Sequence, residues 1–192
     1  MRYPADHKEE TARRIIEKAG PLMRSRGFAG TSLQDVMREA KLTVGGFYNH
    51  FKDKSDVLRY VLAADMNESR KLIVEDLDDL NGDDYAAAVV ERYLSEQHRD
   101  DTKMACDVPY LSAEVARMDD DTKQVYQDYV VKVVGTIAER LDEQDDEDAQ
   151  RHAWELVSKM VGALMIARAV KDPGLSNEIL DACKVGVRRR GV

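Results

Sequence analysis

The sequence predicts an all-α protein of about nine helices. Apolar residues recur every three or four positions along most of the 192 residues, which is the spacing of helices that bury one face. Residues that start or stop helices, such as Gly27, Asp53 and Pro173, separate these runs. The one run rich in β-branched residues, 129–137, lies within a longer helical repeat, so we assign it to a helix as well.

The first 54 residues are expected to form three helices. The first helix runs to Gly27, with a kink at Gly20-Pro21. Thr31 is the expected N-cap of the second helix, and Gln34 three residues later completes a capping box. Thr43 is the expected cap of the third helix. A capped helix, a turn and a second capped helix are typical of a helix-turn-helix unit, which predicts an N-terminal DNA-binding domain.

The remaining residues predict a second, larger helical domain. Asp53 is the expected cap of a long helix that ends near residue 80, where Asn81-Gly82-Asp83-Asp84 breaks the pattern. Further helices are expected at about 85–97, from Pro109 onward, at about 120–141, at about 147–171, and after a cap at Ser176. The chain therefore divides into a domain of residues 1–54 and a domain of residues 55–192.

Composition narrows the class of protein. No window approaches 18 uncharged apolar residues, and the charged N-terminus lacks the apolar segment of a secretion signal. Cys106 and Cys183 are too few for a disulfide framework. We therefore expect no membrane partner and a cytoplasmic location. The basic run Arg188-Arg189-Arg190 is interpreted as a solvated tail.

Charge is unevenly distributed along the chain. Residues 1–54 contain eleven Lys and Arg against seven Asp and Glu, a net charge of +4, whereas residues 55–192 contain eighteen against thirty, a net charge of −12. A basic head on an acidic body is typical of a nucleic-acid footprint confined to one end. When charge is the only observation considered, random fluctuation explains this distribution equally well.

Residues 42–58, Leu-Thr-Val-Gly-Gly-Phe-Tyr-Asn-His-Phe-Lys-Asp-Lys-Ser-Asp-Val-Leu, carry the strongest signal in the chain. The run resembles the recognition-helix signature of the TetR family of transcriptional regulators: a hydroxyl residue opens the helix, a glycine follows two residues later, and a hydrophobe-tyrosine pair, a His-Phe ending and a lysine come after it. Residues 26–32, Arg-Gly-Phe-Ala-Gly-Thr-Ser, resemble the family's link between its first two helices. The resemblance implies a DNA-binding domain followed by a helical ligand-binding and dimerisation domain.

The residues at the start of the predicted recognition helix are candidate contacts to base edges. They are Thr43, Val44, Gly45 and Gly46. Each glycine costs about 1 kcal/mol relative to alanine inside a helix, which suggests that the backbone must approach another surface closely. We favour the DNA groove as that surface. The alternatives are tight packing against the first helix and a frayed helix start.

Other candidate contacts flank this helix. Tyr48 follows the apolar Phe47, so it should point outward, and the resemblance implies a phosphate contact for it. Lys54 opens the next helix, where a cation and a helix N-terminus together favour an anion. Thr31 is a further implied phosphate contact, although it also serves as a cap.

Three polar residues are candidates for variable base reading. Asn49 and His50 are the two stronger candidates, and Gln34 is the third. For His50, packing against the first helix is an equally good interpretation.

The turn before the recognition helix departs from the family pattern. Family members often carry glycine there, whereas this chain has Ala40-Lys41-Leu42. Either Lys41 adopts a positive φ at a cost of about 1 kcal/mol, or the turn has another shape. Its side chain at the tip is also a candidate phosphate contact.

The second domain predicts a dimer interface and an effector pocket. The resemblance implies pairing through the helices at about 120–141 and 147–171. Residues 158–167 are apolar nearly all round and include small residues, which suits an interface or a central core helix. Candidate pocket residues, each of which is also a plain core candidate, are Met66, Tyr93, Cys106, Tyr110, Tyr126 and Trp154. Cys106 has no neighbouring cation in sequence to lower its pKa, so a redox role is weakly supported.

These observations favour a dimeric regulator, most simply a repressor, that binds a palindromic operator in double-stranded DNA and is released by a small-molecule effector. No cofactor or metal is predicted. A helical ligand-binding or adaptor protein without DNA binding is the alternative that the overall charge of −8 supports. An enzyme is not expected, because the chain has no H-E-x-x-H, C-x-x-C or G-x-S-x-G motif.

Overall fold

The computed structural model describes residues 5–100 and 106–185, with the side chains of residues 5–6 and 65–73 outside the described part. Within these ranges it contains ten helices and no strand. The helices are α1 (Ala5–Gly30), α2 (Leu33–Glu39), α3 (Val44–Phe47), α4 (Lys54–Val74), α5 (Gly82–Tyr93), α6 (Glu96–Asp100), α7 (Val108–Val115), α8 (Asp120–Ala138), α9 (Asp146–Ala169) and α10 (Pro173–Val185). The predicted all-α class is confirmed.

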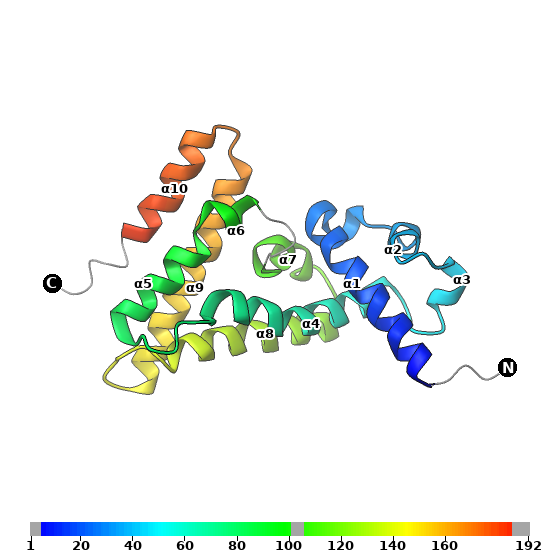
Figure 1. Cartoon of the computed structure of the whole chain (residues 1–192), viewed down its shortest axis with the longest axis horizontal. Coiled ribbons are helices and arrows are strands. Elements are labelled where there is room, and N and C mark those ends of the chain that lie inside the picture. The colour runs from blue at the N-terminus through cyan, green and yellow to red at the C-terminus, as the bar shows by residue number, and fades with distance from the viewer. Residues whose placement is uncertain (1–4, 101–105, 186–192) are drawn as a thin grey trace.

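The helices form an elongated molecule (Figure 1). α1, α2 and α3 cluster at the N-terminal end, and α5, α9 and α10 lie at the opposite end. α4 and α8 pack against each other along the middle, while α7 contacts α1, α8 and α9. α7 therefore contacts helices from both ends of the molecule.

Two hydrophobic clusters hold this arrangement. The N-terminal cluster joins the inner faces of α1, α2 and α3, including Ile15, Met37 and Phe47, to Leu58 of α4 and Leu111 of α7. The larger cluster is built mainly from α5, α8 and α9. Because α4 and α7 complete the N-terminal core, the three N-terminal helices do not bury their apolar faces by themselves. A domain boundary at residue 54 remains a prediction.

Two helix boundaries differ from those expected. α4 ends at Val74, since Asp76 adopts a φ of 61°, and Leu77 packs into the core from a non-helical segment. The helix expected at 85–97 is divided into α5 and α6. It divides because the Ser95 hydroxyl accepts a hydrogen bond from the His98 N–H at 3.1 Å and opens a new helix. This division raises the count to ten.

Two predicted caps were wrong, each displaced by a neighbour. Ser32, not Thr31, caps α2, and its box partner is Asp35 instead of Gln34. Ser176 lies inside α10, where its hydroxyl donates to the Ala167 carbonyl at 2.7 Å. Asp172 opens that helix instead, since its carboxylate accepts a hydrogen bond from the Leu175 N–H at 2.7 Å. In both cases the predicted residue is buried, so its hydroxyl is used elsewhere.

Other predicted features are confirmed. Gly27 interrupts α1 with a φ of 74°. Asp53 accepts a hydrogen bond from the Asp56 N–H at 2.8 Å and so caps α4. Residues 129–137 are helical, within α8. The basic run Arg188-Arg189-Arg190 lies outside the described residues. Among the helices described, none combines the length and apolar character needed to cross a membrane.

Candidate nucleic-acid interface and internal cavity

α2, a tight turn and α3 form the helix-turn-helix unit. Lys41 lies at the tip of the turn with a φ of 56°, and the next residue's N–H donates to the Met37 carbonyl at 2.9 Å. This left-handed conformation costs a side-chain-bearing residue about 1–2 kcal/mol. The first of the two predicted turn shapes is therefore the one observed. It leaves the Lys41 side chain exposed at the tip.

The outer side of α3 is open. Thr43, Val44 and Gly45 are all exposed. A Cβ atom added to Gly45 would meet no atom within 4 Å, and one added to Gly46 would make only an ordinary contact with the Thr43 hydroxyl. These glycines are therefore not required by packing against α1. Their free space faces outward, as close approach to another surface demands.

Tyr48 extends this open side. Its ring is 68% exposed, whereas the preceding Phe47 is fully buried, as the sequence predicts. The two rings meet edge to face with centroids 5.3 Å apart. Phe47 thus anchors the backbone in the core and fixes the direction in which the Tyr48 hydroxyl points.

Three other candidate side chains border this surface. Gln34 and Asn49 are exposed, and His50 is half-buried. The Nδ1 atom of His50 is buried and has no hydrogen-bond partner within the described residues. Burial, followed by the nearby charges of Lys8 and His7, lowers the pKa of His50. A neutral imidazole at this edge is able to donate or accept a hydrogen bond.

Thr31 does not reach this surface. The residue is fully buried, and its hydroxyl donates to the Gly27 carbonyl at 2.8 Å and the Leu22 carbonyl at 3.2 Å. These bonds satisfy carbonyls left open where Gly27 interrupts the helix. The structure thus gives Thr31 a role in closing the α1–α2 link in place of the implied phosphate contact.

Lys54 is also turned inward. Its ammonium donates to the Phe28 carbonyl at 2.6 Å and the Thr31 carbonyl at 2.9 Å, and lies 4.1 Å from the centre of the Phe28 ring. Burial lowers the pKa of this group. In this conformation Lys54 ties the start of α4 to the α1–α2 link, so the implied phosphate contact is not available to it.

The N-terminal unit matches a family model described as bacterial regulatory proteins of the tetR family, over residues 15–61. The match covers the turn, α3 and the start of α4 described above. Over these residues the chain is similar to the tetR family of bacterial regulatory proteins.

Curated regulators resemble part of this chain. It is 29% identical over 83 residues to the HTH-type transcriptional repressor DhaR of Mycobacterium sp. (strain GP1), covering 40% of this chain and 42% of DhaR. It is 33% identical over 85 residues to the HTH-type transcriptional regulator SAB2452 of Staphylococcus aureus (strain bovine RF122 / ET3-1), covering 44% and 46%. The chain thus aligns with less than half the length of these relatives.

Solved structures resemble the whole fold. A TetR-family regulator from Cytophaga hutchinsonii has a TM-score of 0.77 at 19% identity over 95% of both chains. The reduced form of NemR from E. coli has a TM-score of 0.74 at 21% identity, over 93% of this chain and 95% of NemR. AibR, solved with isovaleryl coenzyme A and operator DNA, has a TM-score of 0.66 at 18% identity, over 91% and 96%. These similarities extend the shared fold to α5–α10.

A small internal cavity lies among α5, α7, α8 and α9. Two of the predicted pocket residues, Tyr93 and Cys106, line it together with apolar residues of α8 and α9 such as Val133 and Met160. Its volume is about 10 Å³, which is about enough for one water molecule. In this conformation the cavity is nearly closed, so a ligand larger than water requires the surrounding helices to separate.

The other predicted pocket residues lie elsewhere. Tyr110 and Tyr126 are half-buried beside the N-terminal core, where the Tyr126 hydroxyl lies 2.5 Å from the Ser112 hydroxyl. The side chain of Met66 is outside the described residues. The structure therefore brings only Tyr93 and Cys106 together at this cavity.

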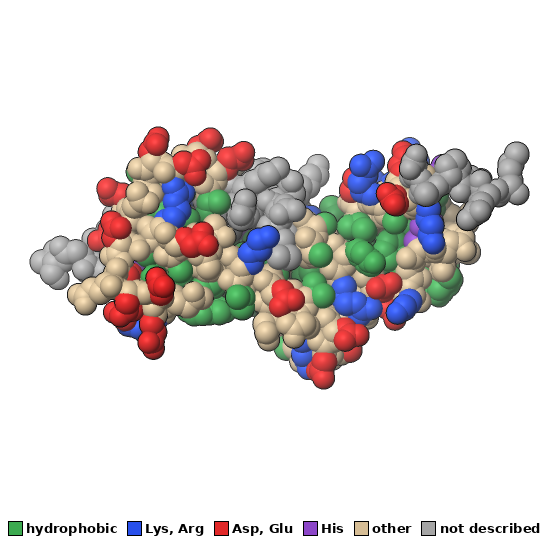
Figure 2. Space-filling model, turned by 90° about the horizontal axis from the view of Figure 1, so that it is seen from below, with side chains coloured by type: hydrophobic (Ala, Val, Ile, Leu, Met, Phe, Trp, Pro, Cys, Tyr) green, Lys and Arg blue, Asp and Glu red, His purple; other side chains and the backbone are tan. Residues whose placement is uncertain are grey.

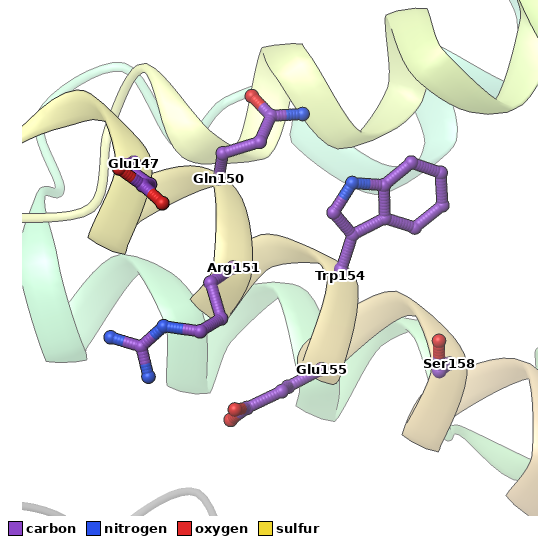
Figure 3. A pocket seen from close by; sticks show the side chains of 6 residues that line it. All are labelled: Glu147, Gln150, Arg151, Trp154, Glu155 and Ser158. Atoms are coloured by element: carbon purple, nitrogen blue, oxygen red, sulfur yellow. The ribbon is translucent and has the colours of Figure 1, made fainter.

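Trp154 belongs to the surface, contrary to its assignment to an internal pocket. Its side chain is 39% exposed and borders a shallow hollow of about 600 Å³ on α9. Figure 3 shows the hollow, with Trp154 and Gln150 pointing to one side of the helix and Arg151 and Glu155 to the other. The apolar spacing that placed Trp154 in a buried stripe does not distinguish a core from a surface that a partner covers.

Sequence reasoning missed the charged residues that join the two ends of the molecule. The Glu114 carboxylate on α7 accepts hydrogen bonds from the backbone N–H groups of Phe28 at 2.7 Å and Ala29 at 2.9 Å. Arg24 and Asp107 form a buried ion pair between α1 and the residue before α7. Both acidic residues look like ordinary charges in the sequence, which carries no signal for partners more than 80 positions away.

Proposed function

We propose that this chain is a DNA-binding transcriptional repressor whose α3 surface enters the major groove. The open space in front of Gly45 is the observation that carries this proposal, because it lets the backbone approach DNA closely. Thr43 and Val44 are positioned at the helix start, where base edges are read, with Asn49 at its other end. Tyr48 and Lys41 are the proposed phosphate contacts, with Gln34 and His50 at the edge.

The charge of the molecule supports the same orientation. Figure 2 shows acidic side chains spread over the end formed by α5, α9 and α10, while lysine and arginine side chains are interspersed at the opposite end. Residues 1–54 carry a net charge of +4, and the rest of the chain −12. DNA is therefore attracted to one end and repelled from the other.

We propose pairing of two copies through α8 and α9. Trp154, Met165 and Val131 are exposed apolar residues on these two helices, which pack against each other. Cβ atoms added to Gly135 or Gly162 would meet no atom within 4 Å, so both glycines leave room for a close helix from outside. Exposed apolar surface of this kind is typical of a protein interface.

A dimer of this kind accounts for specificity. One recognition helix reads too few base pairs to select a site in a genome, whereas two related by a two-fold axis read a palindrome. The neighbour AibR, solved with both operator DNA and a coenzyme A thioester, supports a small-molecule effector for this chain as well. Such a role acts by binding and not by catalysis, and it requires a location in the cytoplasm with the DNA.

We propose that α7 carries the effector signal to the DNA-binding end. Cys106 at the cavity is followed directly by Asp107, which pairs with Arg24 of α1. At the other end of α7, Glu114 holds the α1–α2 link. A ligand that separates the helices around the cavity therefore displaces α1, and with it the spacing of the two α3 helices. The ligand shifts this equilibrium only by binding the two states with different affinity.

Gly45→Leu tests the DNA-binding surface. Because a side chain at this position meets only open space, the variant should keep its melting temperature and its oligomeric state. It should lose binding to double-stranded DNA, measured by fluorescence anisotropy at low salt, because the new side chain blocks approach to the groove. Ala116→Leu, which adds similar bulk at an exposed position on the α7–α8 side, is the matched control and should bind normally.

Two outcomes contradict the proposal. Unchanged DNA affinity of Gly45→Leu would show that α3 does not approach the groove. No binding of the unmodified chain to any duplex at low salt would favour the alternative of a ligand-binding or adaptor protein without DNA binding.

A further inference from the structure

The guanidinium of Arg168, near the end of α9, has one nitrogen that is buried and unsatisfied. Its Nε donates to the Arg99 carbonyl at 3.0 Å and its Nη2 to the His98 carbonyl at 2.7 Å. The group lies 4.2 Å from the centre of the Tyr110 ring. Its Nη1 has no hydrogen-bond partner within residues 5–100 and 106–185. The bonds to α6 therefore hold the guanidinium in place while one donor remains available.

A second available donor lies at the cavity. Tyr93 is 97% buried, lines the cavity, and its hydroxyl has no hydrogen-bond partner in the described part of the chain. Tyr93 and Arg168 both contact His98: the Tyr93 and His98 ring centres are 4.5 Å apart, and Arg168 donates to the His98 carbonyl at 2.7 Å. Buried donors without partners are rare in folded proteins, because each loses its hydrogen bonds to water on burial. Two of them close together point to a missing acceptor.

The chemistry of these groups defines the acceptor. A guanidinium and a phenol both donate, and a guanidinium prefers an anion such as a carboxylate. The neighbouring Cys106 does not supply that anion, since burial raises the pKa of its thiol and keeps it neutral. Burial lowers the pKa of Arg168, because removing a guanidinium from water disfavours its charged form.

The rest of the cavity defines the body of the ligand. Its other walls are apolar and include Val130, Val133 and Ile137 of α8 and Val157 of α9. A short aliphatic chain suits these walls, whereas a sugar or a nucleotide base would leave its polar groups without partners. Because the cavity is nearly closed, binding requires α8 and α9 to move apart, which is the displacement that the proposed repressor needs.

We propose that Arg168 and Tyr93 form the head-group site for an aliphatic carboxylate, with the cavity between α8 and α9 receiving its chain. The site deepens the proposed function, since it names the chemical class of the effector. Arg168 is the anion-binding residue, and Tyr93 orients the carboxylate through its hydroxyl.

The test compares three six-carbon probes on the full chain by isothermal titration calorimetry: hexanoate, hexanamide and 1-hexanol. Hexanoate should bind about tenfold or more tightly than the two neutral probes, because only it pairs with the guanidinium. Equal affinity for all three would show an apolar cavity without anion recognition and would overturn the proposal. Binding of none of them would overturn it as well.

Two variants test the roles proposed for the donors Arg168 and Tyr93. Arg168→Gln should reduce hexanoate affinity about tenfold or more and leave the affinity for 1-hexanol unchanged. Tyr93→Phe should reduce hexanoate affinity about fivefold while the melting temperature of the free chain stays the same or rises, because a buried unsatisfied hydroxyl is removed. This second variant keeps the test valid if Arg168→Gln loosens α6. Arg117→Gln, the same change at an exposed position, is the matched control and should bind hexanoate normally.

Different results would contradict the proposed carboxylate site and the proposed DNA-binding role. Hexanoate binding without DNA binding would contradict the proposed repressor and leave the carboxylate site standing. DNA binding that no carboxylate probe alters, together with no calorimetric signal, would contradict the site and leave the repressor standing.

Discussion

The guanidinium of Arg24 donates a hydrogen bond of 3.0 Å to the carboxylate of Asp107, and both side chains are buried. The pair joins α1 of the DNA-binding end to the residue directly after Cys106, which lines the internal cavity. Together with the Glu114 carboxylate on the backbone of Phe28 and Ala29, it attaches α7 to α1 at two points. The two ends of the molecule are therefore connected by specific charge-assisted bonds and not by apolar packing alone.

Arg24→Met should lower the free energy of unfolding by about 3 kcal/mol, because removing one partner leaves the other charge buried. Urea denaturation of the full chain measures this loss. The matched control is Arg13→Met on the same helix, where the ion pair with Glu17 is 3.7 Å long and more than 60% exposed on both sides. That change should cost about 0.5 kcal/mol or less. Equal losses in the two variants would show that the buried pair has no special role.

Lys54 and Lys41 should respond differently to substitution, because one cation points inward and the other outward. Lys54→Met removes bonds to two carbonyls and should lower stability by about 1–3 kcal/mol. It should also weaken DNA binding without changing the salt dependence of the affinity. Lys41→Met should leave stability nearly unchanged and reduce the slope of log affinity against log salt by about 0.9, the value for one lost phosphate contact.

Anisotropy titrations at several salt concentrations separate these outcomes. A reduced slope for Lys54→Met with normal stability would mean that its ammonium leaves the two carbonyls and binds phosphate in the complex. The structural role assigned to Lys54 would then be wrong.

Met165→Glu should convert the proposed dimer to a monomer, because a charge would be placed on the exposed apolar face of α9. Sedimentation velocity at micromolar concentration measures the change. Since Met165 is 39% exposed in the single chain, folding of the monomer should be preserved. Leu175→Glu makes the same change at an exposed position of α10, outside the proposed interface, and should remain dimeric. The reverse pattern would move the interface to α10.

Ser32→Ala should cost about 1 kcal/mol of stability, the usual value for a lost N-cap. Gln34→Ala should cost nearly nothing, since Gln34 is exposed and Asp35 completes the capping box. Thermal denaturation of the two variants compares them directly. A larger loss for Gln34→Ala would restore the cap predicted from the sequence.

Patterns with a local physical cause were predictable from the sequence. Phe47 and Tyr48 show this well: helical spacing fixes which of two adjacent residues is buried, and the burial observed agrees. Lys41 is an intermediate case, because the sequence predicted either a positive φ there or another turn shape, and the structure shows the positive φ. The order of helices in the helix-turn-helix unit depends on such short-range rules, so it was predicted, whereas the cap of α2 was not.

Features that depend on tertiary contacts were not predictable. Thr31 and Ser32 are both good caps by residue type, and only the burial of Thr31 decides between them. The direction of Lys54 depends on carbonyls exposed by a glycine more than 20 positions earlier. Trp154 fits a core and an interface equally well by spacing, because both surfaces are apolar.

In vitro selection from random double-stranded DNA with the full chain shows whether the open side of α3 reads DNA. The recovered sequences should share a two-fold symmetric motif with half-sites about 10–10.5 base pairs apart, or multiples of that spacing. Gly45→Leu, carried through the same selection, should recover no motif. Recovery of the same motif by Gly45→Leu, or of none by the unmodified chain, would contradict the claim that the open side of α3 reads DNA.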